Sequence, residues 1–243
     1  KLPSNLTAEQ ILVRSGNIGS VRIAQKVGEN NFKRFLEKIG VIGDINFDIE
    51  EVATHKDFSM GKCKLATASF GHGISTTLLQ LAKGYSVISN GGYTVNPKLI
   101  FKDSEKLQNE KKMILKKDVS EKLIKILRKI VTDDEGTAGL ANIDGYEIAG
   151  KTGTAEQVID GQYSKTKINT FASVFPSPKP EFVFIVMLDS PKGSPDYVYN
   201  YRNKKGSFTG TPFNTAGWTS VEVAGQILEK IGPILATKYS EVD

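Results

Sequence analysis

A cation and two hydroxyl groups stand next to one another in the second half of the chain, where Lys151, Thr152, Gly153 and Thr154 are consecutive. The ammonium group and the two threonine hydroxyls can together bind a carboxylate. Gly150 and Gly153 flank the lysine inside an expected strand, where glycine weakens packing and often marks a place where another backbone approaches closely. Such a strand can accept an extended peptide along its edge. The alternative is a glycine-kinked edge strand with a solvated lysine.

A serine and an asparagine two residues apart, Ser15 and Asn17, form a second candidate pair far upstream of the lysine. Taken alone, this spacing has a plain explanation, since asparagine is a common helix N-cap. Together, the two patterns follow the order of two signatures of serine β-lactamases and penicillin-binding proteins, whose full set is Ser-x-x-Lys, Ser-Asp-Asn and Lys-Thr-Gly. The combination indicates acyl-transfer chemistry at a serine.

The likeness extends over nearly the whole chain, which resembles the transpeptidase domain of class B penicillin-binding proteins, of the elongation or division type. Small departures are Leu78, where the family usually has proline, and His72. The matching segments are 15–19 (Ser-Gly-Asn-Ile-Gly), 71–82 (Gly-His-Gly-Ile-Ser-Thr-Thr-Leu-Leu-Gln-Leu-Ala), 135–138 (Glu-Gly-Thr-Ala), 145–155 (Gly-Tyr-Glu-Ile-Ala-Gly-Lys-Thr-Gly-Thr-Ala) and 169–176.

The nucleophile of this family lies in a Ser-x-x-Lys motif upstream of Ser-x-Asn, and the residues before Ser15 contain no such motif. Two downstream matches are interpreted as chance. Residues 59–62 lie in an irregular stretch with a glycine inside, and residues 164–167 lie in a polar connection between strands, whereas the chemistry needs serine and lysine on one helical face. We therefore expect the chain to be the C-terminal portion of the domain, with the nucleophile helix upstream, and to be inactive alone.

The resemblance implies a reaction and two catalytic residues. In this family a serine attacks the D-Ala-D-Ala amide of a peptidoglycan stem peptide, and an amine of a neighbouring stem resolves the acyl-enzyme. Lys151 would be a second cation that keeps the lysine of the missing motif neutral, so that this lysine can act as the base. Ser15 would bridge the two lysines and relay a proton toward the leaving amine.

The resemblance also implies the substrate contacts. The amide of Asn17, donor and acceptor at once, would bind a substrate backbone amide. Thr152 and Thr154 would hold the terminal carboxylate on the strand that contains Gly153. The backbone N–H of Thr154 would form half of the oxyanion hole, with the N–H of the missing serine as the other half.

The partners implied by the family are peptidoglycan stem peptides, β-lactam antibiotics, and a glycosyltransferase with its wall-synthesis complex. No cofactor is implied. The family also implies a single N-terminal membrane anchor, with this domain on the outer, periplasmic side of the cytoplasmic membrane. The alternative is a non-catalytic relative that serves as a binding or scaffold module in wall synthesis.

The composition excludes several other functions. The chain has 243 residues, of which 39% are hydrophobic and 24% charged, as in an ordinary folded domain. Its net charge of +5 comes mostly from lysines spread along the chain, whereas nucleic-acid readers cluster their basic residues. Cys63 is the single cysteine, which excludes an internal disulfide and a cysteine-built metal site. His55 and His72 occur without a Gly-x-Ser-x-Gly elbow, which disfavours a Ser-His-Asp triad.

The elements that must position these residues follow from the hydrophobic pattern. It predicts an α+β fold in one domain, residues 1–243, with an antiparallel β-sheet and helices on both sides. The links between the main strands are too short for helical crossovers, so neighbours should pair antiparallel. Residues 41–74 are expected to be irregular. We expect strands at 93–101 (broken by Pro97), 146–155, 169–175 and 182–189, and helices after a capping box at 7–10 and at about 17–27, 32–39, 77–89, 119–131 and 220–231.

Overall fold

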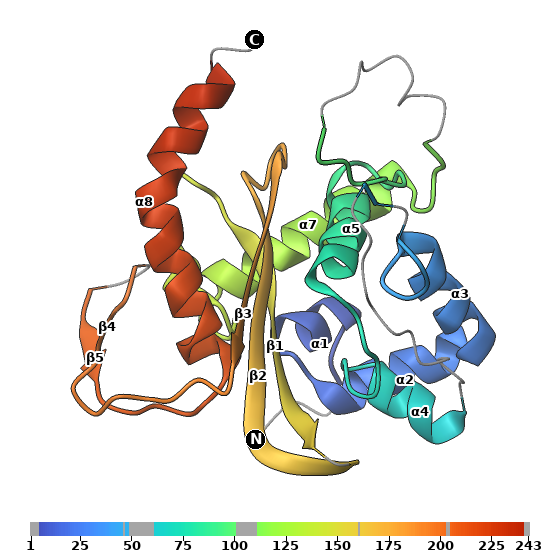
Figure 1. Cartoon of the computed structure of the whole chain (residues 1–243), viewed down its shortest axis with the longest axis horizontal. Coiled ribbons are helices and arrows are strands. Elements are labelled where there is room, and N and C mark those ends of the chain that lie inside the picture. The colour runs from blue at the N-terminus through green and yellow to red at the C-terminus, as the bar shows by residue number, and fades with distance from the viewer. Residues whose placement is uncertain are drawn as a thin grey trace. The chain divides into compact units, whose positions relative to one another are not determined.

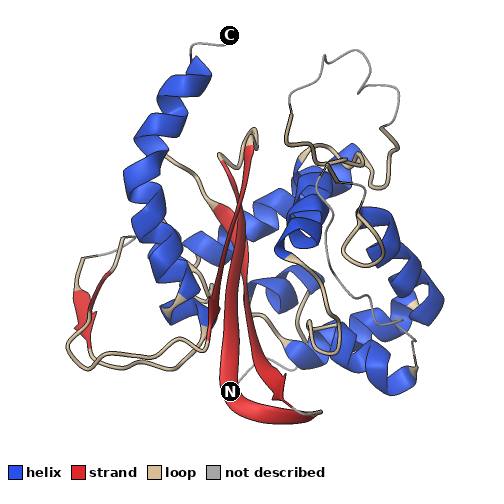
Figure 2. Cartoon of the chain, viewed as in Figure 1, coloured by secondary structure: helices blue, strands red, loops and turns tan. Residues whose placement is uncertain are grey.

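The chain divides into two compact units. A computed structural model describes residues 5–45, 47–48, 61–100, 111–159, 161–202 and 205–240. The first unit, here called the helical unit, comprises Lys1–Leu12 and Gly16–Ile124, and the second, the sheet unit, comprises Val13–Ser15 and Lys125–Asp243. Figures 1 and 2 show the helices and strands of each. Helix α7 (Lys117–Thr132) begins in the helical unit and ends in the sheet unit.

The helical unit consists of helices that begin and end at local signals. Thr7 and Gln10 form the predicted capping box: the amide of Thr7 donates to Oε1 of Gln10 (2.9 Å) and the amide of Gln10 to Oγ1 of Thr7 (3.2 Å). Thr77 and Gln80 form a second one. Gly40 ends α3 with a φ of 78°, in the left-handed region that glycine adopts readily. The helices are α1 (Ala8–Val13), α2 (Asn17–Val27), α3 (Glu29–Ile39), α4 (Lys62–Ala68) and α5 (Leu78–Ser89).

The start of α2 differs from the N-cap explanation of Asn17. The N-cap is Gly16, with φ −80° and ψ 107°, and Asn17 is the first helical residue. The carbonyl of Gly16 accepts the amide of Ser20 at 3.1 Å, which begins the helical ladder one residue earlier than expected. No side chain makes a capping hydrogen bond at this end. The side-chain amide of Asn17 therefore does not cap the helix.

The strand predicted at residues 93–101 was wrong for the residues that the structure describes, and Phe101 lies outside them. Tyr93 makes only an isolated antiparallel bridge to Met113. Pro97 has no N–H to donate to a ladder, so pairing cannot extend past it. Helix α4 was also missed, since it lies inside a stretch that was expected to be irregular.

The sheet unit contains a three-stranded antiparallel meander in the order β1-β2-β3. The strands are β1 (Ala149–Ile159), β2 (Gln162–Phe175) and β3 (Phe182–Asp189). The register places Lys151 opposite Ala172 and Thr154 opposite Asn169. All three predicted strands are present, those of β1 and β2 with shifted or longer bounds. The α+β prediction with an antiparallel sheet is thus confirmed.

A long C-terminal helix covers part of this sheet. Helix α8 (Ser220–Ser240) packs against β2 and β3, and its residues Val221 and Leu228 are fully buried. The helix was predicted to end at about residue 231, but α8 continues through Gly232 and Pro233 to Ser240. In the structure Gly232 lies against the ring of Tyr146, which leaves no room for a Cβ atom. This glycine therefore serves packing rather than helix termination.

A short hairpin and two 3₁₀ turns complete the sheet unit. The hairpin pairs β4 (Val198–Asn200) with β5 (Ser207–Thr209), and the turns are η1 (Gly139–Ala141) and η2 (Ala216–Trp218). Among the described residues, no helix is long and apolar enough to cross a membrane.

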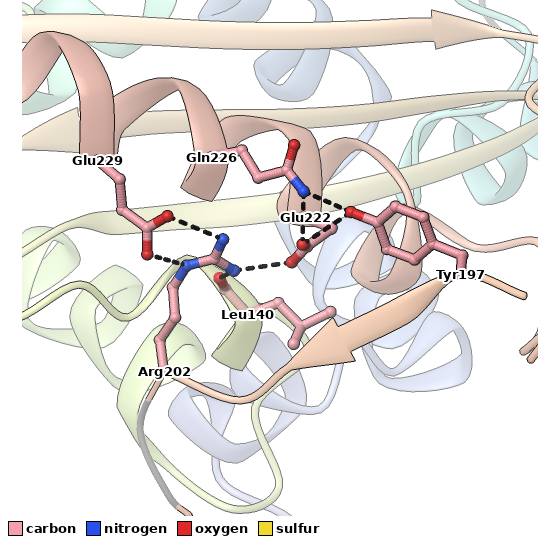
Figure 3. Close-up of polar contacts among 6 residues, drawn as sticks. All are labelled: Leu140, Tyr197, Arg202, Glu222, Gln226 and Glu229. Carbon is pink, nitrogen blue, oxygen red and sulfur yellow. Dashed lines mark hydrogen bonds and ion pairs between the residues drawn. The ribbon is translucent and has the colours of Figure 1, made fainter. Parts of the chain in front are cut away.

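A charged cluster around Arg202 joins this hairpin to α8 and η1 (Figure 3). Nη1 of Arg202 donates to Oε2 of Glu222 (2.7 Å) and to the carbonyl of Leu140 (2.5 Å). Nε and Nη2 donate to the two carboxylate oxygens of Glu229, at 2.7 and 3.3 Å. The hydroxyl of Tyr197 donates to Oε1 of Glu222 at 3.1 Å. The guanidinium thus donates hydrogen bonds to two carboxylates and one carbonyl.

Candidate active site

The structure brings Ser15 and Lys151 into direct contact within the sheet unit. Nζ of Lys151 donates to Oγ of Ser15 at 2.7 Å, although 136 residue positions separate them. Ser15 lies between α1 and α2 with a φ of 56°, a left-handed conformation that is uncommon for a residue with a side chain. Arg14, just before it, forms an ion pair with Glu135. The serine is therefore held in a strained backbone position beside the lysine.

The surroundings of Lys151 consist of uncharged oxygens. Besides Ser15, its Nζ donates to the carbonyl of Thr152 at 2.9 Å and approaches the Oγ1 of Thr152 at 3.5 Å. Burial lowers the pKa of the Lys151 ammonium from 10.5 to about 8. The group is thus still mainly protonated at pH 7, as a cation that has lost much of its hydration.

The two threonines that follow are on one side of the strand, because alternate residues of a strand share a face. Oγ1 of Thr152 lies 2.7 Å from Oγ1 of Thr137. Oγ1 of Thr154 accepts the backbone N–H of Ala216, in η2, at 2.9 Å. Since a hydroxyl that accepts an N–H keeps its own hydrogen, the Thr154 hydroxyl can still donate to an anion.

The backbone of β1 is also suited to ligand approach. β1 pairs with β2 alone among the described strands, so it forms an edge of its sheet. A Cβ atom at Gly150 would lie 2.7 Å from the ring of Phe171, so internal packing requires this glycine. A Cβ atom at Gly153 would meet only Thr170, at ordinary distances of 3.9 and 4.0 Å. Internal packing therefore does not explain the exposed Gly153.

The remaining motif residues fall elsewhere. Asn17 begins α2 in the helical unit. The Ser-x-x-Lys match at residues 164–167 was expected in a connection, but it lies inside β2. Ser164 and Lys167, three positions apart on a strand, point to opposite faces, so this match cannot supply the chemistry. The match at residues 59–62 includes Ser59, which lies outside the described residues.

Two features of the site were not predicted from the sequence. Thr137 belongs to the segment 135–138, which resembles the family, but nothing in its sequence indicates a contact with Thr152. Ala216 lies in a stretch without any recognised motif, and only the folded chain brings its N–H to Thr154. No group of three or more histidine, cysteine, aspartate or glutamate side chains able to hold a metal occurs in the described part of the chain.

Comparison with known proteins decides the family. The family model for the penicillin binding protein transpeptidase domain matches residues 1–209. The chain belongs to this family. Among curated relatives of this transpeptidase chain, the probable peptidoglycan D,D-transpeptidase FtsI of Caulobacter vibrioides (strain NA1000 / CB15N) is 28% identical over 244 residues, which cover 96% of this chain and 39% of the relative. Stage V sporulation protein D of Bacillus subtilis (strain 168) is 29% identical over 198 residues, covering 76% and 30%. The transpeptidase chain thus spans less than half the length of these relatives.

Solved structures agree on the fold. The transpeptidase domain of penicillin-binding protein 3 from Burkholderia pseudomallei superposes with a TM-score of 0.78 at 22% identity, covering 95% of this chain and 65% of that one. Penicillin-binding protein 3 from Mycobacterium tuberculosis, in complex with aztreonam, gives a TM-score of 0.70 at 23% identity, covering 93% and 52%. The predicted transpeptidase fold is confirmed.

Proposed function

We propose that this chain is the C-terminal portion of a serine D,D-transpeptidase domain that cross-links peptidoglycan in cell-wall synthesis and is acylated by β-lactams. The observation that carries the proposal is the 2.7 Å hydrogen bond from Lys151 to Ser15. It joins two motifs of the family that lie far apart in the sequence. The geometry of the neighbouring threonines and family membership support the same function.

In the proposed reaction, the nucleophilic serine and its lysine come from a Ser-x-x-Lys motif upstream of this chain. The serine oxygen attacks the carbonyl carbon between the two D-alanines, the C–N bond breaks, and the terminal D-alanine leaves as an amine that gains a proton. An amine from a second stem peptide then attacks the acyl ester, and the serine regains its proton. Ser15 relays the proton to the leaving amine, and the cation of Lys151 keeps the upstream lysine neutral.

The terminal carboxylate of the substrate is proposed to bind at the strand β1. Lys151 supplies the positive charge, and the hydroxyls of Thr152 and Thr154 supply hydrogen bonds. Gly153 adds no side chain at this exposed position of the edge, which lets the peptide backbone approach. Asn17 is proposed to bind a substrate amide, since its side chain is not needed as the cap of α2.

The partners and the location of the whole protein follow from the same proposal. The substrates are peptidoglycan stem peptides, and a glycosyltransferase that supplies the glycan strands is the expected partner in the wall-synthesis complex. The domain is proposed to work on the outer, periplasmic side of the cytoplasmic membrane, held by a single-pass anchor elsewhere in the parent protein. By parent protein we mean the natural chain that contains these 243 residues.

Labelling with a fluorescent penicillin, followed by denaturing electrophoresis, tests the function. The parent protein should be labelled covalently, and the 243-residue chain alone should not, because its nucleophile is missing. An unlabelled parent protein would instead indicate a non-catalytic relative. Stoichiometric labelling of the 243-residue chain would show that the nucleophile is inside it, and Ser59 would then be the first residue to replace.

A further inference from the structure

The segment between α7 and η1 touches both halves of the proposed site. Its residue Glu135 forms the ion pair with Arg14, the neighbour of Ser15. Its residue Thr137 places Oγ1 at 2.7 Å from Oγ1 of Thr152. One short segment thus contacts the residue next to the proton relay and one of the two threonines proposed to bind the carboxylate.

The backbone around Thr137 is tightly packed, so the position of its hydroxyl is well defined. A Cβ atom at Gly136 would collide with the carbonyl of Ile130, which also accepts the amide of Ala138 at 3.1 Å. Ala138 is fully buried. On the other side, a Cβ atom at Gly217 would lie 2.7 Å from the carbonyl of Thr137. Two glycines therefore allow the backbone on both sides of Thr137 to approach closely.

The hydrogen-bond capacity of Thr152 shows what this contact does. A hydroxyl has one hydrogen and two acceptor positions, whereas an ammonium group can only donate. Lys151 approaches Oγ1 of Thr152 at 3.5 Å as a donor. If Thr137 also donates, both acceptor positions of Thr152 are filled and its hydrogen remains for a third group. If Thr152 donated to Thr137 instead, it could offer no hydrogen to a carboxylate.

We infer that Thr137 is a positioning residue for the proposed transpeptidase. Its hydroxyl donates to Thr152, which leaves the hydrogen of Thr152 for the substrate carboxylate. The carboxylate itself selects this arrangement, since an anion attracts the hydroxyl hydrogen and repels a lone pair. The inference rests on the proposed function and adds a residue to which no role had been given.

The test compares two substrates and three variants of the parent protein. The second-order rate of acylation is measured by mass spectrometry with benzylpenicillin and with its methyl ester, which lacks the anionic carboxylate. Thr137→Val removes the hydroxyl at nearly constant shape, Thr137→Ser keeps it, and Thr132→Val is a matched control at the exposed end of α7.

Thr137→Val should slow acylation by benzylpenicillin about tenfold, because the Thr152 hydroxyl is no longer held in place and its hydrogen bond to the charged carboxylate is weakened. Its rate with the methyl ester should change less than about twofold, because the affected contact is absent. Thr137→Ser and Thr132→Val should stay within about twofold of the unsubstituted protein with both compounds. The carboxylate dependence is the part that a purely structural role would not produce.

Two results would overturn the inference while leaving the proposed function intact: an equal loss of rate with both compounds, or no loss with either, in a parent protein that is itself acylated. A parent protein that neither compound acylates would overturn the proposed function together with this inference.

Discussion

Lys151 and Arg202 are two cations in the same unit with opposite surroundings. Lys151 makes its hydrogen bonds to a serine hydroxyl and to the carbonyl and hydroxyl of Thr152, all uncharged. Arg202 meets the carboxylates of Glu222 and Glu229 at 2.7 Å. Burial by itself would lower both pKa values. It does so for Lys151, whereas the hydrogen bonds of Arg202 to Glu229 and Glu222 raise the pKa of its guanidinium overall.

The difference separates a binding role from a structural one. A buried cation with carboxylate partners is already neutralised, and it ties together the elements that carry those partners. A cation desolvated beside neutral oxygens costs stability until an anion arrives, which is typical of functional sites. The comparison therefore supports Lys151 as the anion site and assigns Arg202 to fixing the β4–β5 hairpin on α8 and η1.

The largest expected effect is on activity at Lys151. Replacement of Lys151 by Met in the parent protein should slow acylation by benzylpenicillin by roughly 10²–10⁴-fold, because the second cation and the carboxylate contact are both lost. Stopped-flow or mass-spectrometric acylation rates measure this. Lys165→Met, at an exposed position on β2, is the control and should change the rate little. A loss of similar size in both variants would show that Lys151 has no specific role in acylation.

The next effect is on stability at Arg202. Arg202→Met in the 243-residue chain should lower the free energy of unfolding by about 3–5 kcal/mol, since it leaves Glu222 buried without its cation. Trp218 is the single tryptophan and lies in the sheet unit, so its fluorescence in urea reports the transition. Glu229→Gln should cost only about 1 kcal/mol, because that side chain is half exposed. Equal losses in the two variants would contradict a buried charge at Glu222.

A smaller effect of opposite sign is expected for stability at Lys151. In the folded chain this ammonium has a pKa of about 8 against 10.5 for an ordinary lysine, so its charged form is disfavoured by folding. Lys151→Met should therefore raise the free energy of unfolding at pH 7 by about 2 kcal/mol. The unfolded chain binds more protons between pH 8 and 10.5, so the stability of the unsubstituted chain rises over that window and the gain of the variant fades. A gain that stays constant up to pH 10.5 would show that the pKa is not lowered.

The smallest effect is the pH dependence of acylation around neutrality. If the cationic form of Lys151 is required, the acylation rate falls about twofold at pH 8 and then roughly tenfold per pH unit above it, since the pKa lies near 8 rather than 10.5. Rates measured from pH 6 to 9.5, with enzyme stability checked at each value, test this. A rate that rises through pH 8 would instead assign Lys151 the role of a neutral base.

Local patterns predicted much of the secondary structure. The capping box at Thr7 and Gln10, the glycine stop at Gly40 and the strand at 182–189 appear where the sequence placed them. The errors have long-range causes. The helix predicted at about 220–231 ends too early, and Gly232, just beyond it, accommodates the ring of Tyr146, which is distant in sequence. The apolar residues near Tyr93 looked like a strand, yet only one bridge forms there among the described residues.

By itself, the sequence determined the motif residues, their order, and the placement of Thr152 and Thr154 on one face of a strand, because these depend on residue type and near neighbours. Only the tertiary structure decided that Lys151 meets Ser15, that Thr137 reaches Thr152, and that Ala216 donates to Thr154. It also decided which buried cation is neutralised and which is not. The physical reason is that burial and hydrogen bonding between distant segments arise only when the chain folds.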